Sequence, residues 1–252
     1  SGSNLNFDFA SLNLGSLPNT FGIPGAREHA VPAKPFELLL ARWSELLDKG
    51  PAAPRIAIAG AGAAGVELAM AMKFALGQRG RNAEVVLFSE KILFSPGVAI
   101  RIQKSLERKK IQLRPTTPVL AVQPGPLVVS SSGRERFDAL FWTAGAAPLP
   151  WLRDSALALD SAGYVLVDAA LRSVSHPNVF AAGDTAMLQG AALPKSGVFA
   201  VRQGEVLAEN LKRAFQGESL RQYEPQANSL ALISCGSKYA IAGRGGWSAE
   251  GA

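Results

Sequence analysis

The chain has 252 residues, of which 48% are hydrophobic and 18% charged, and its 26 lysines and arginines against 20 aspartates and glutamates give a net charge of +6. This composition can bury a substantial core, which excludes a disordered protein and allows one large domain or two small ones. The basic residues are scattered apart from Arg108-Lys109-Lys110, at the end of an expected helix where cations complement the helix dipole, so we expect no nucleic acid partner.

The composition also limits sulfur and metal chemistry. Cys235 is the only cysteine, which excludes an intramolecular disulfide and a CxxC redox pair, and its apolar, strand-like surroundings predict a buried structural thiol. His29 and His176 lie in loop-like sequence without metal-binding spacing, so we expect no metal site. No run of about 18 apolar residues is present, so we expect no transmembrane segment. We therefore expect a cytoplasmic protein, with peripheral attachment to a membrane as the alternative.

In chain order, the first elements are a short strand, a helix and a βαβ unit. Residues 7–14 alternate enough for a strand, and the segment from Pro35 to Gly50 has one apolar face and predicts a helix. Residues 55–59 and 82–89 are short apolar runs that predict buried strands, and 66–76 between them predicts a helix. Strand, glycine turn, helix and strand is the order that a parallel sheet requires.

After a helix expected from Ser95 to about Lys110, the pattern changes to short β runs separated by Pro, Gly and Ser clusters. We expect an antiparallel meander whose last strand rejoins the parallel sheet. Its strands are expected at 111–113, 119–122, 127–130 and 136–142. Beyond it, we expect strands at 164–167 and 178–184, a helix at 198–215 and a hairpin at 229–233 and 239–242.

The turn Gly60-Ala61-Gly62-Ala63-Ala64-Gly65 joins the strand at 55–59 to its helix. In this spacing Gly60 permits the tight turn, Gly62 lets the backbone approach a pyrophosphate, and Gly65 lets helix and strand pack closely. The helix N-terminus, at Ala63 and Ala64, then offers N–H groups and positive potential to phosphates. Because the turn lies between a strand and a helix, the motif predicts a dinucleotide-binding Rossmann unit.

The second strand of such a unit should end with an acid that accepts hydrogen bonds from the adenosine ribose hydroxyls. Here the strand ends with Phe88-Ser89-Glu90-Lys91, and either Ser89 or Glu90 can occupy that place. Glu90 would favour NAD, whereas Ser89 with Lys91 or Arg79 nearby would tolerate the 2′-phosphate of NADP. The sequence leaves this choice open.

Three motifs follow one another along the chain. They are the Gly60–Gly65 turn continued by Val66-Glu67-Leu68-Ala69, then Trp142-Thr143-Ala144-Gly145-Ala146, then Val179-Phe180-Ala181-Ala182-Gly183-Asp184. In this order they resemble the two-dinucleotide-fold flavoprotein reductases, the pyridine nucleotide-disulfide oxidoreductase superfamily, which includes type II NADH dehydrogenases. The resemblance implies that the Gly60 turn binds NAD(P)H with Glu67 near the nicotinamide. It also implies that Thr143-Ala144-Gly145 is the crossover to the FAD domain and that Asp184, after Gly183, hydrogen-bonds the flavin ribityl chain.

Further segments resemble, more narrowly, an NADH-dehydrogenase-like flavoprotein module that is fused to a selenophosphate synthetase in some organisms. These segments are Asn13-Leu14-Gly15-Ser16, Ile23-Pro24-Gly25-Ala26, residues 29–35, residues 195–204 and Arg244-Gly245-Gly246-Trp247. By this likeness, Lys195, Gly197 and Val198 lie beside the isoalloxazine, at the start of the helix that completes the flavin site.

The sequence departs from the family pattern at both ends. No GxGxxG precedes Gly60 to bind the ADP part of FAD, and relatives continue past Ala252, so we expect a fragment in which FAD binding is weak or lost. The expected fold class is α/β, a Rossmann-type parallel sheet with a β-meander crossover plus part of a FAD-binding domain. The expected domains are 1–51, a FAD-domain remnant with linker and helix; 52–147, the NAD(P)-binding domain; and 148–252, the C-terminal part of the FAD domain.

The resemblance implies an FAD-dependent NAD(P)H oxidoreductase in which hydride passes to the flavin and then to an unidentified acceptor, without a redox disulfide. The acceptor is left open, with a quinone as one candidate, and the candidate protein partners are a fused or separate selenophosphate synthetase and a second copy of the chain in a homodimer. The quinone-site sequence usual in type II NADH dehydrogenases is matched only at Gln203. One alternative is a nicotinamide-sensing module without turnover of its own. A flavin-free NAD-dependent dehydrogenase ranks last, because no acid–base constellation is evident and Gly183-Asp184 would be unexplained.

Overall fold

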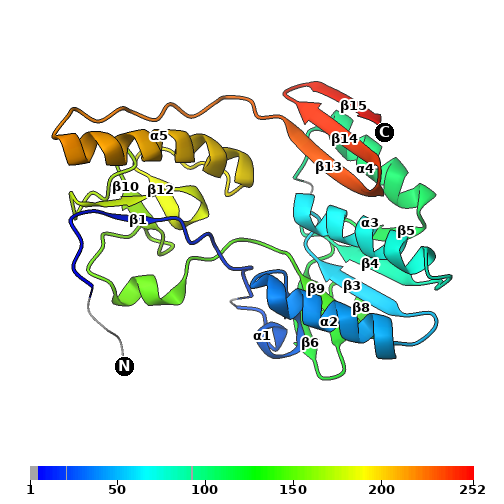
Figure 1. Ribbon diagram of the computed structural model, residues 1–252. Helices are drawn as coiled ribbons and strands as arrows, with labels where there is room; N and C mark the ends of the chain where they lie inside the picture. The colour runs from blue at the N-terminus through cyan, green and yellow to red at the C-terminus, as the bar shows by residue number, and fades with distance from the viewer. Residues whose placement is uncertain (1–4, 21, 92) are drawn as a thin grey trace. The chain divides into compact units, whose positions relative to one another are not determined.

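The computed structural model describes residues 5–20, 22–91 and 93–252. The chain divides into two compact units, whose elements are labelled in Figure 1. Unit 1 takes the residues up to Leu17 and Ala146–Ala227, and unit 2 takes Pro18–Gly145 and Asn228–Ala252. The chain therefore passes from unit 1 into unit 2, returns to unit 1, and ends in unit 2.

Unit 2 is built on a five-stranded parallel sheet in the order β2-β9-β3-β4-β5. Helix α3 (Ala63–Gly77) connects β3 to β4, and α4 (Pro96–Arg108) connects β4 to β5, so each is a crossover between neighbouring parallel strands. The α/β fold class and the predicted βαβ unit are confirmed. The strands are β2 (Val31–Pro32), β3 (Arg55–Ala59), β4 (Glu84–Phe88), β5 (Ile111–Arg114) and β9 (Ala139–Trp142).

Side chains that alternate along β3 and β4 separate two cores. Ile56 and Ile58 of β3 are buried on one face with side chains of α2 (Phe36–Lys49), α3 and α4. Ala57 and Ala59 are buried on the opposite face with α1 (Ala26–His29) and the meander. Because both faces are covered, these strands are continuous apolar runs in the sequence, without a polar side.

An antiparallel meander leads from β5 to β9, as the sequence predicts, but with different strands. The run at 111–113 is β5, which pairs in parallel with β4 and forms the edge of the main sheet because α4 returns the chain to that edge. A strand not predicted, β8, begins at Gly133, where φ of +128° closes a tight turn after β7. The meander strands are β6 (Val119–Gln123), β7 (Leu127–Ser130) and β8 (Gly133–Arg136).

A three-stranded antiparallel sheet near the end of the chain packs on α3 and α4 (Figure 1). Ile233, Cys235 and Ile241 are buried in the same core as α3, and the thiol of Cys235 is buried as predicted. At Gly236 a Cβ would lie 2.3 Å from the Met70 carbonyl oxygen, so glycine is needed where this sheet meets α3. The strands are β13 (Ala231–Ser237), β14 (Tyr239–Arg244) and β15 (Trp247–Gly251).

The boundaries of the units differ from those of the expected domains. The expected FAD-domain remnant at 1–51 contains α2, whose Leu46 is buried with the parallel sheet of unit 2. The expected C-terminal FAD piece at 148–252 contains β13–β15, which also belong to unit 2 through residues such as Ile233. Both assignments depend on contacts between distant parts of the chain, which local sequence patterns do not encode.

Unit 1 consists of two pairs of parallel strands and one long helix. Helix α5 contributes Val206 and Leu207 to a core that includes Phe180 of β11. The helix predicted at 198–215 is confirmed, and the strand predicted at 7–14 is reduced to three residues. The pairs are β1 (Ala10–Leu12) with β11 (Val179–Ala181) and β10 (Val165–Val167) with β12 (Ala186–Leu188); α5 spans Gly197–Gln216, and 3-10 turns lie at Pro150–Asp154 and Gly183–Thr185.

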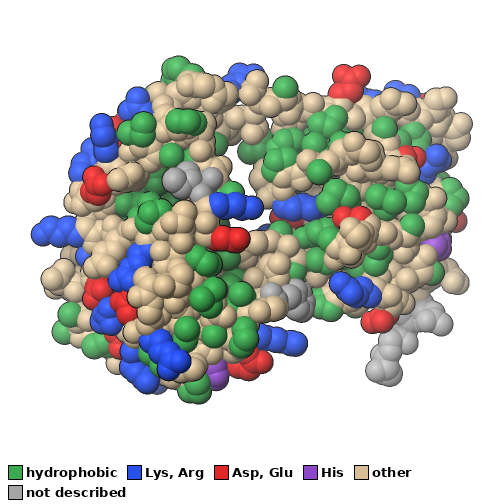
Figure 2. Space-filling model, turned by 180° about the vertical axis from the view of Figure 1, so that it is seen from behind, with side chains coloured by type: hydrophobic (Ala, Val, Ile, Leu, Met, Phe, Trp, Pro, Cys, Tyr) green, Lys and Arg blue, Asp and Glu red, His purple; other side chains and the backbone are tan. Residues whose placement is uncertain are grey.

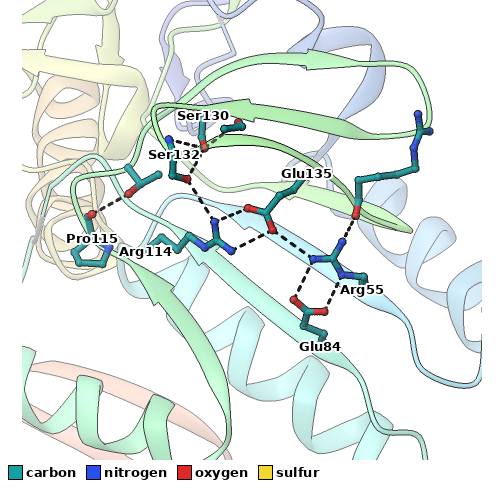
Figure 3. Close-up of polar contacts among 10 residues, drawn as sticks. Arg55, Glu84, Arg114, Pro115, Ser130, Ser132 and Glu135 are labelled. Carbon is teal, nitrogen blue, oxygen red and sulfur yellow. Dashed lines mark hydrogen bonds and ion pairs between the residues drawn. The ribbon is translucent and has the colours of Figure 1, made fainter.

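An ion-pair network ties the meander to the parallel sheet (Figure 3). Arg55, at the start of β3, donates two hydrogen bonds to the Glu84 carboxylate, at 2.7 and 3.1 Å. Glu135 of β8 accepts hydrogen bonds from Arg114 of β5 and lies 3.4 Å from the Arg55 guanidinium.

On the face shown in Figure 2, lysine and arginine side chains are dispersed among apolar and acidic ones.

We predict that Glu84→Gln destabilises unit 2 in a pH-dependent way. The hydrogen bonds from Arg55 lower the pKa of Glu84. A carboxyl group with a lowered native pKa stabilises the fold above its unfolded-state pKa, and this contribution is lost as pH falls through the native pKa. The substitution should therefore reduce the free energy of unfolding at neutral pH. The reduction should be only about 0.5–1 kcal/mol, because the ion pair is partly exposed. At a pH below the native pKa of Glu84 the substitution should leave the free energy of unfolding unchanged. Urea denaturation at the two pH values measures the difference.

Glu107→Gln is the matched control, since Glu107 is exposed on α4 and its carboxylate accepts a hydrogen bond from Gln103 of the same helix. Its effect on unfolding should stay within about 0.5 kcal/mol. A deficit of Glu84→Gln that persists unchanged in acid would contradict the assignment.

Candidate functional site

A cleft of about 560 Å³ opens in unit 2 at the carboxyl ends of β3, β4 and β9. In open α/β sheets, ligands bind outside this edge of the strands. The cleft brings together predicted site residues from three separate segments of the sequence. These are Gly60, Gly62, Ser89, Glu90, Thr143, Ala144 and Gly145.

The turn at Gly60 is possible only without a side chain. Its φ of +106° lies in the left-handed region, and a Cβ there would lie 2.7 Å from the Ala144 backbone nitrogen and 2.9 Å from the Thr143 hydroxyl. The Thr143 hydroxyl lies 3.0 Å from the Ala59 carbonyl oxygen and 2.9 Å from that of Gly60. Strand β3 therefore turns directly against the segment that leaves β9.

Gly65 and Gly62 are glycines for different reasons. A Cβ on Gly65 would lie 1.8 Å from the Gly60 carbonyl oxygen, so a side chain there would force α3 away from β3. A Cβ on Gly62 would meet only Leu93 Cδ1, at the ordinary contact distance of 3.5 Å, and its φ of −73° suits any residue. The protein fold thus requires Gly65, whereas the bare backbone at Gly62 leaves space in the cleft.

The N-terminus of α3 lies beside this space. Gly62 is the N-cap residue and offers no side-chain hydrogen bond, and Ala63 and Ala64 of the first turn are exposed. The first N–H groups of a 15-residue helix are therefore left without a side-chain cap, at the positive end of its dipole. This arrangement suits an anionic group such as a phosphate.

The structure distinguishes the two residues at the end of β4. Ser89 is 3% exposed, its hydroxyl donates to the Lys91 carbonyl oxygen at 2.7 Å, and its backbone N–H donates to Arg114. Glu90 is exposed on the wall of the cleft. The carboxylate of Glu90 is therefore accessible to a ligand, while the hydroxyl of Ser89 holds the loop.

Glu67 does not line the cleft. Its carboxylate accepts a hydrogen bond of 2.9 Å from the backbone N–H of Ser234 in β13, and so it fastens the C-terminal sheet to α3. The placement near a nicotinamide, implied by the family resemblance, stays a prediction.

Residues outside the predicted site list make up the rest of the cleft wall. Asn19 is one of them: its N–H donates to the Ala144 carbonyl oxygen at 3.0 Å, and its carbonyl oxygen accepts from the Trp142 indole at 2.9 Å. No motif marks Asn19, Leu93, Pro118, Val119 and Leu120, because only the tertiary fold brings their segments to the strand ends. The other wall residues belong to or adjoin the predicted motifs, and they are Ile23, Ala59, Ala61, Phe88, Lys91 and Trp142.

In unit 1 the predicted Gly183-Asp184 pair forms a turn after β11. Gly183 has φ of +67°, and the Asp184 carboxylate accepts a hydrogen bond of 3.1 Å from the Ser16 hydroxyl. The hydroxyl of Thr185 accepts from the Leu14 N–H at 2.9 Å. The turn is thus fixed against the segment that follows β1, so the Asn13-Leu14-Gly15-Ser16 segment and the Gly183-Asp184 turn lie together.

Lys195, Gly197 and Val198 lie at the start of α5. The Lys195 ammonium donates to the Ala186 carbonyl oxygen and lies 4.0 Å from the centre of the Tyr164 ring, and burial lowers the pKa of Lys195. Gly197 is the first residue of α5 and Val198 is exposed. Lys195 lines a small cavity together with Gly183 and Asp184.

Two further features concern metals and membranes. Within residues 5–20, 22–91 and 93–252, no three histidine, cysteine, aspartate or glutamate side chains gather as a metal site would require. Of the helices in those same ranges, none combines the length and the apolar character needed to cross a bilayer.

The parallel sheet, the glycine turn and the meander crossover define a Rossmann-type dinucleotide-binding fold. A family model described as pyridine nucleotide-disulphide oxidoreductase matches residues 1–204. The chain belongs to this family of oxidoreductases.

Two curated relatives are named as a reductase and an oxidoreductase that act on quinones. A demethylphylloquinone reductase of Synechocystis sp. is 29% identical over 240 residues, which cover 90% of this chain and 59% of the relative. A type II NADH:quinone oxidoreductase of Staphylococcus epidermidis is 26% identical over 246 residues, which cover 86% of this chain and 61% of the relative. The chain thus spans about three fifths of the length of these relatives.

Solved structures share the fold. The sulfide:quinone oxidoreductase from Aquifex aeolicus aligns with a TM-score of 0.76 at 14% identity, over 99% of this chain and 66% of that one. The water-forming NADH oxidase from Lactobacillus brevis, bound to NADH, aligns with a TM-score of 0.72 at 21% identity, over 94% of this chain and 52% of that one.

We predict that Gly65→Ala and Gly62→Ala separate folding from binding. Gly65→Ala should lower the free energy of unfolding by more than about 3 kcal/mol, because its Cβ overlaps a backbone carbonyl. Gly62→Ala, the matched control three residues earlier in the same motif, should change the free energy of unfolding by less than about 1 kcal/mol. Urea denaturation of both variants measures these values, and a stable Gly65→Ala protein would contradict the packing described.

Proposed function

We propose that the chain carries the nicotinamide-binding part, with a portion of the flavin-binding part, of an FAD-dependent NAD(P)H oxidoreductase. In this function the chain would hold NAD(P)H and part of the flavin, and the bound cofactors would supply hydride transfer from NAD(P)H to the flavin and electrons for an acceptor. The observation that carries the proposal is the cleft, in which the bare backbone of Gly62 adjoins the uncapped N-terminus of α3. Membership of the oxidoreductase family supports it.

The pyrophosphate and the adenine of a dinucleotide each have a matching surface in the cleft. The pyrophosphate would lie over Gly62, where the first amides of α3 stabilise its charge. Leu93 and Leu120 expose apolar surface in the cleft, which suits the adenine ring. The Thr143 hydroxyl is held between two carbonyl oxygens, so its role is to fix the turn.

We further propose that the dinucleotide is NADH. Glu90 presents an exposed carboxylate at the end of β4, where it can accept hydrogen bonds from both ribose hydroxyls of the adenosine. The same carboxylate would repel the 2′-phosphate of NADPH. Ser89, the alternative that would tolerate that phosphate, is buried and bonded to the loop backbone.

The residues of unit 1 fit part of a flavin site. The Asp184 carboxylate is oriented by the Ser16 hydroxyl, and a carboxylate so held can accept hydrogen bonds from the hydroxyls of a ribityl chain. Lys195, partly buried at the start of α5, can stabilise negative charge on a flavin ring. When bound, FAD would supply the two-electron chemistry, while these side chains hold and orient it.

The acceptor is proposed to be a quinone, the substrate class named for two relatives. A membrane-dissolved quinone would bring the protein to a membrane surface as a peripheral enzyme. Cys235 is fully buried, so electrons do not leave through that thiol. A selenophosphate synthetase partner is proposed only from the segments that resemble the fused module, and the homodimer stays a prediction.

The proposal is tested by the visible spectrum of the purified chain after incubation with FAD and removal of free ligand, followed by anaerobic NADH. Because no GxGxxG precedes Gly60 to bind the ADP part of FAD, we expect a protein that binds NADH and retains little or no flavin absorbance. Loss of NADH binding would contradict the proposal, and FAD that stays bound and is bleached by NADH would contradict the expected weak flavin binding and make the chain itself a reductase.

We predict that Glu90→Ala relaxes the choice of nicotinamide cofactor. Loss of hydrogen bonds to a carboxylate should weaken NADH binding by about tenfold or more, while NADPH binding should strengthen because the repulsion is removed. Calorimetric titration with both cofactors measures the two dissociation constants. Ser89→Ala is the matched control and should leave their ratio unchanged; a shift in the control alone would assign the choice to Ser89.

A further inference from the structure

Gln203 links helix α5 to the turn that presents Asp184. Its side chain is 5% exposed, and its carboxamide oxygen accepts a hydrogen bond of 2.6 Å from the backbone N–H of Gly183, twenty residues earlier. A short, buried hydrogen bond between distant parts of the chain is expensive to lose, because the N–H would be left without a partner. Gln203 therefore fixes the backbone of the turn.

The turn has little freedom apart from this bond. Gly183 is in the left-handed region at φ of +67°, and a Cβ there would lie 2.8 Å from Asn13 Oδ1 and 3.2 Å from the Cβ of Ala200. Ala200 and Gln203 are one turn apart on the same helix, so α5 contacts the turn at two points. A change at Gln203 is thus transmitted directly to the position of the next residue, Asp184.

Two different groups hold Asp184. The Ser16 hydroxyl orients its carboxylate, and Gln203 fixes the peptide that precedes it. Both Gln203 and Asp184 line the small cavity that also contains Lys195. The buried carboxamide is consequently part of the support for the polar groups of this cavity.

We propose that Gln203 is a positioning residue for the flavin-contacting turn at Gly183-Asp184, and that it is not a ligand of the electron acceptor. The effect of Gln203 on flavin binding rests on the proposed function, whereas its hold on the turn rests on the hydrogen bond to Gly183. The acceptor oxygen of Gln203 is already used within the fold, and 5% exposure leaves little surface for a substrate. Support of the turn is enough to explain why Gln203 matches the quinone-site sequence of type II NADH dehydrogenases.

The experiment compares Gln203→Met, which keeps the shape and removes the acceptor, with Gln203→Glu, which keeps an acceptor oxygen. Gln216→Met, at the exposed end of the same helix, is the control. Amide hydrogen exchange is followed by mass spectrometry in a peptide that spans Gly183, with the unliganded chain. We expect exchange about tenfold faster in Gln203→Met and close to wild type in Gln203→Glu and the control. Unchanged exchange in Gln203→Met would overturn the positioning role.

A second readout concerns the flavin and the acceptor. With FAD bound, Gln203→Met should raise the FAD dissociation constant by about tenfold, leave the KM for a soluble quinone unchanged, and be rescued by Gln203→Glu. A raised quinone KM with unchanged FAD affinity would overturn the proposal and make Gln203 an acceptor ligand. If the wild-type chain binds FAD too weakly for this readout, the exchange experiment, which needs no flavin, decides whether Gln203 holds the turn, whereas loss of NADH binding would count against the proposed function.

Discussion

The cleft depends on one close contact, at which strand β3, helix α3 and the segment after β9 meet without side chains between them. A Cβ on Gly65 would overlap the Gly60 carbonyl oxygen, and a Cβ on Gly60 would overlap the backbone of Ala144. The three segments can therefore meet only where glycine stands. Thr143 completes the junction with a hydroxyl beside the carbonyl oxygens of β3. The same junction leaves the N-terminus of α3 open at the edge of the sheet, which is where charge on a ligand is stabilised.

Local patterns predicted much of the fold, and long-range contacts account for the rest. The βαβ unit and helices α2 and α5 follow from apolar periodicity and from Gly and Pro at their ends, which are properties of neighbouring residues. The strand at Ile111–Arg114 was expected in the meander but joins the parallel sheet, because α4 returns it to the edge. The sheet formed by β13–β15 was expected with the FAD domain, but Ile233 and Ile241 are buried against α3. A short apolar run does not indicate which strand or helix it will pair with or pack against.

Sequence motifs predicted part of the candidate site, but the residues that only the tertiary fold brings to the cleft were missed. Gly60 and Gly62 are marked by their spacing, and the structure places them in the cleft as expected. The choice between Ser89 and Glu90 depends on where β4 ends, and a difference of one residue decides which side chain is buried. Asn19, Leu120 and the other unmarked wall residues reach the cleft only because the tertiary fold brings their segments to the strand ends. The same limit applies to Gln203, whose hydrogen bond to Gly183 spans two elements.

The most direct test of the central claim, that unit 2 binds a dinucleotide at the ends of β3, β4 and β9, is a crystal structure of the chain with NADH. We expect a pyrophosphate over Gly62, within hydrogen-bonding distance of the first amides of α3, and the adenosine ribose beside Glu90. NADH bound elsewhere on the protein, or a cleft that stays empty at a saturating concentration of NADH, would contradict this assignment of the cleft.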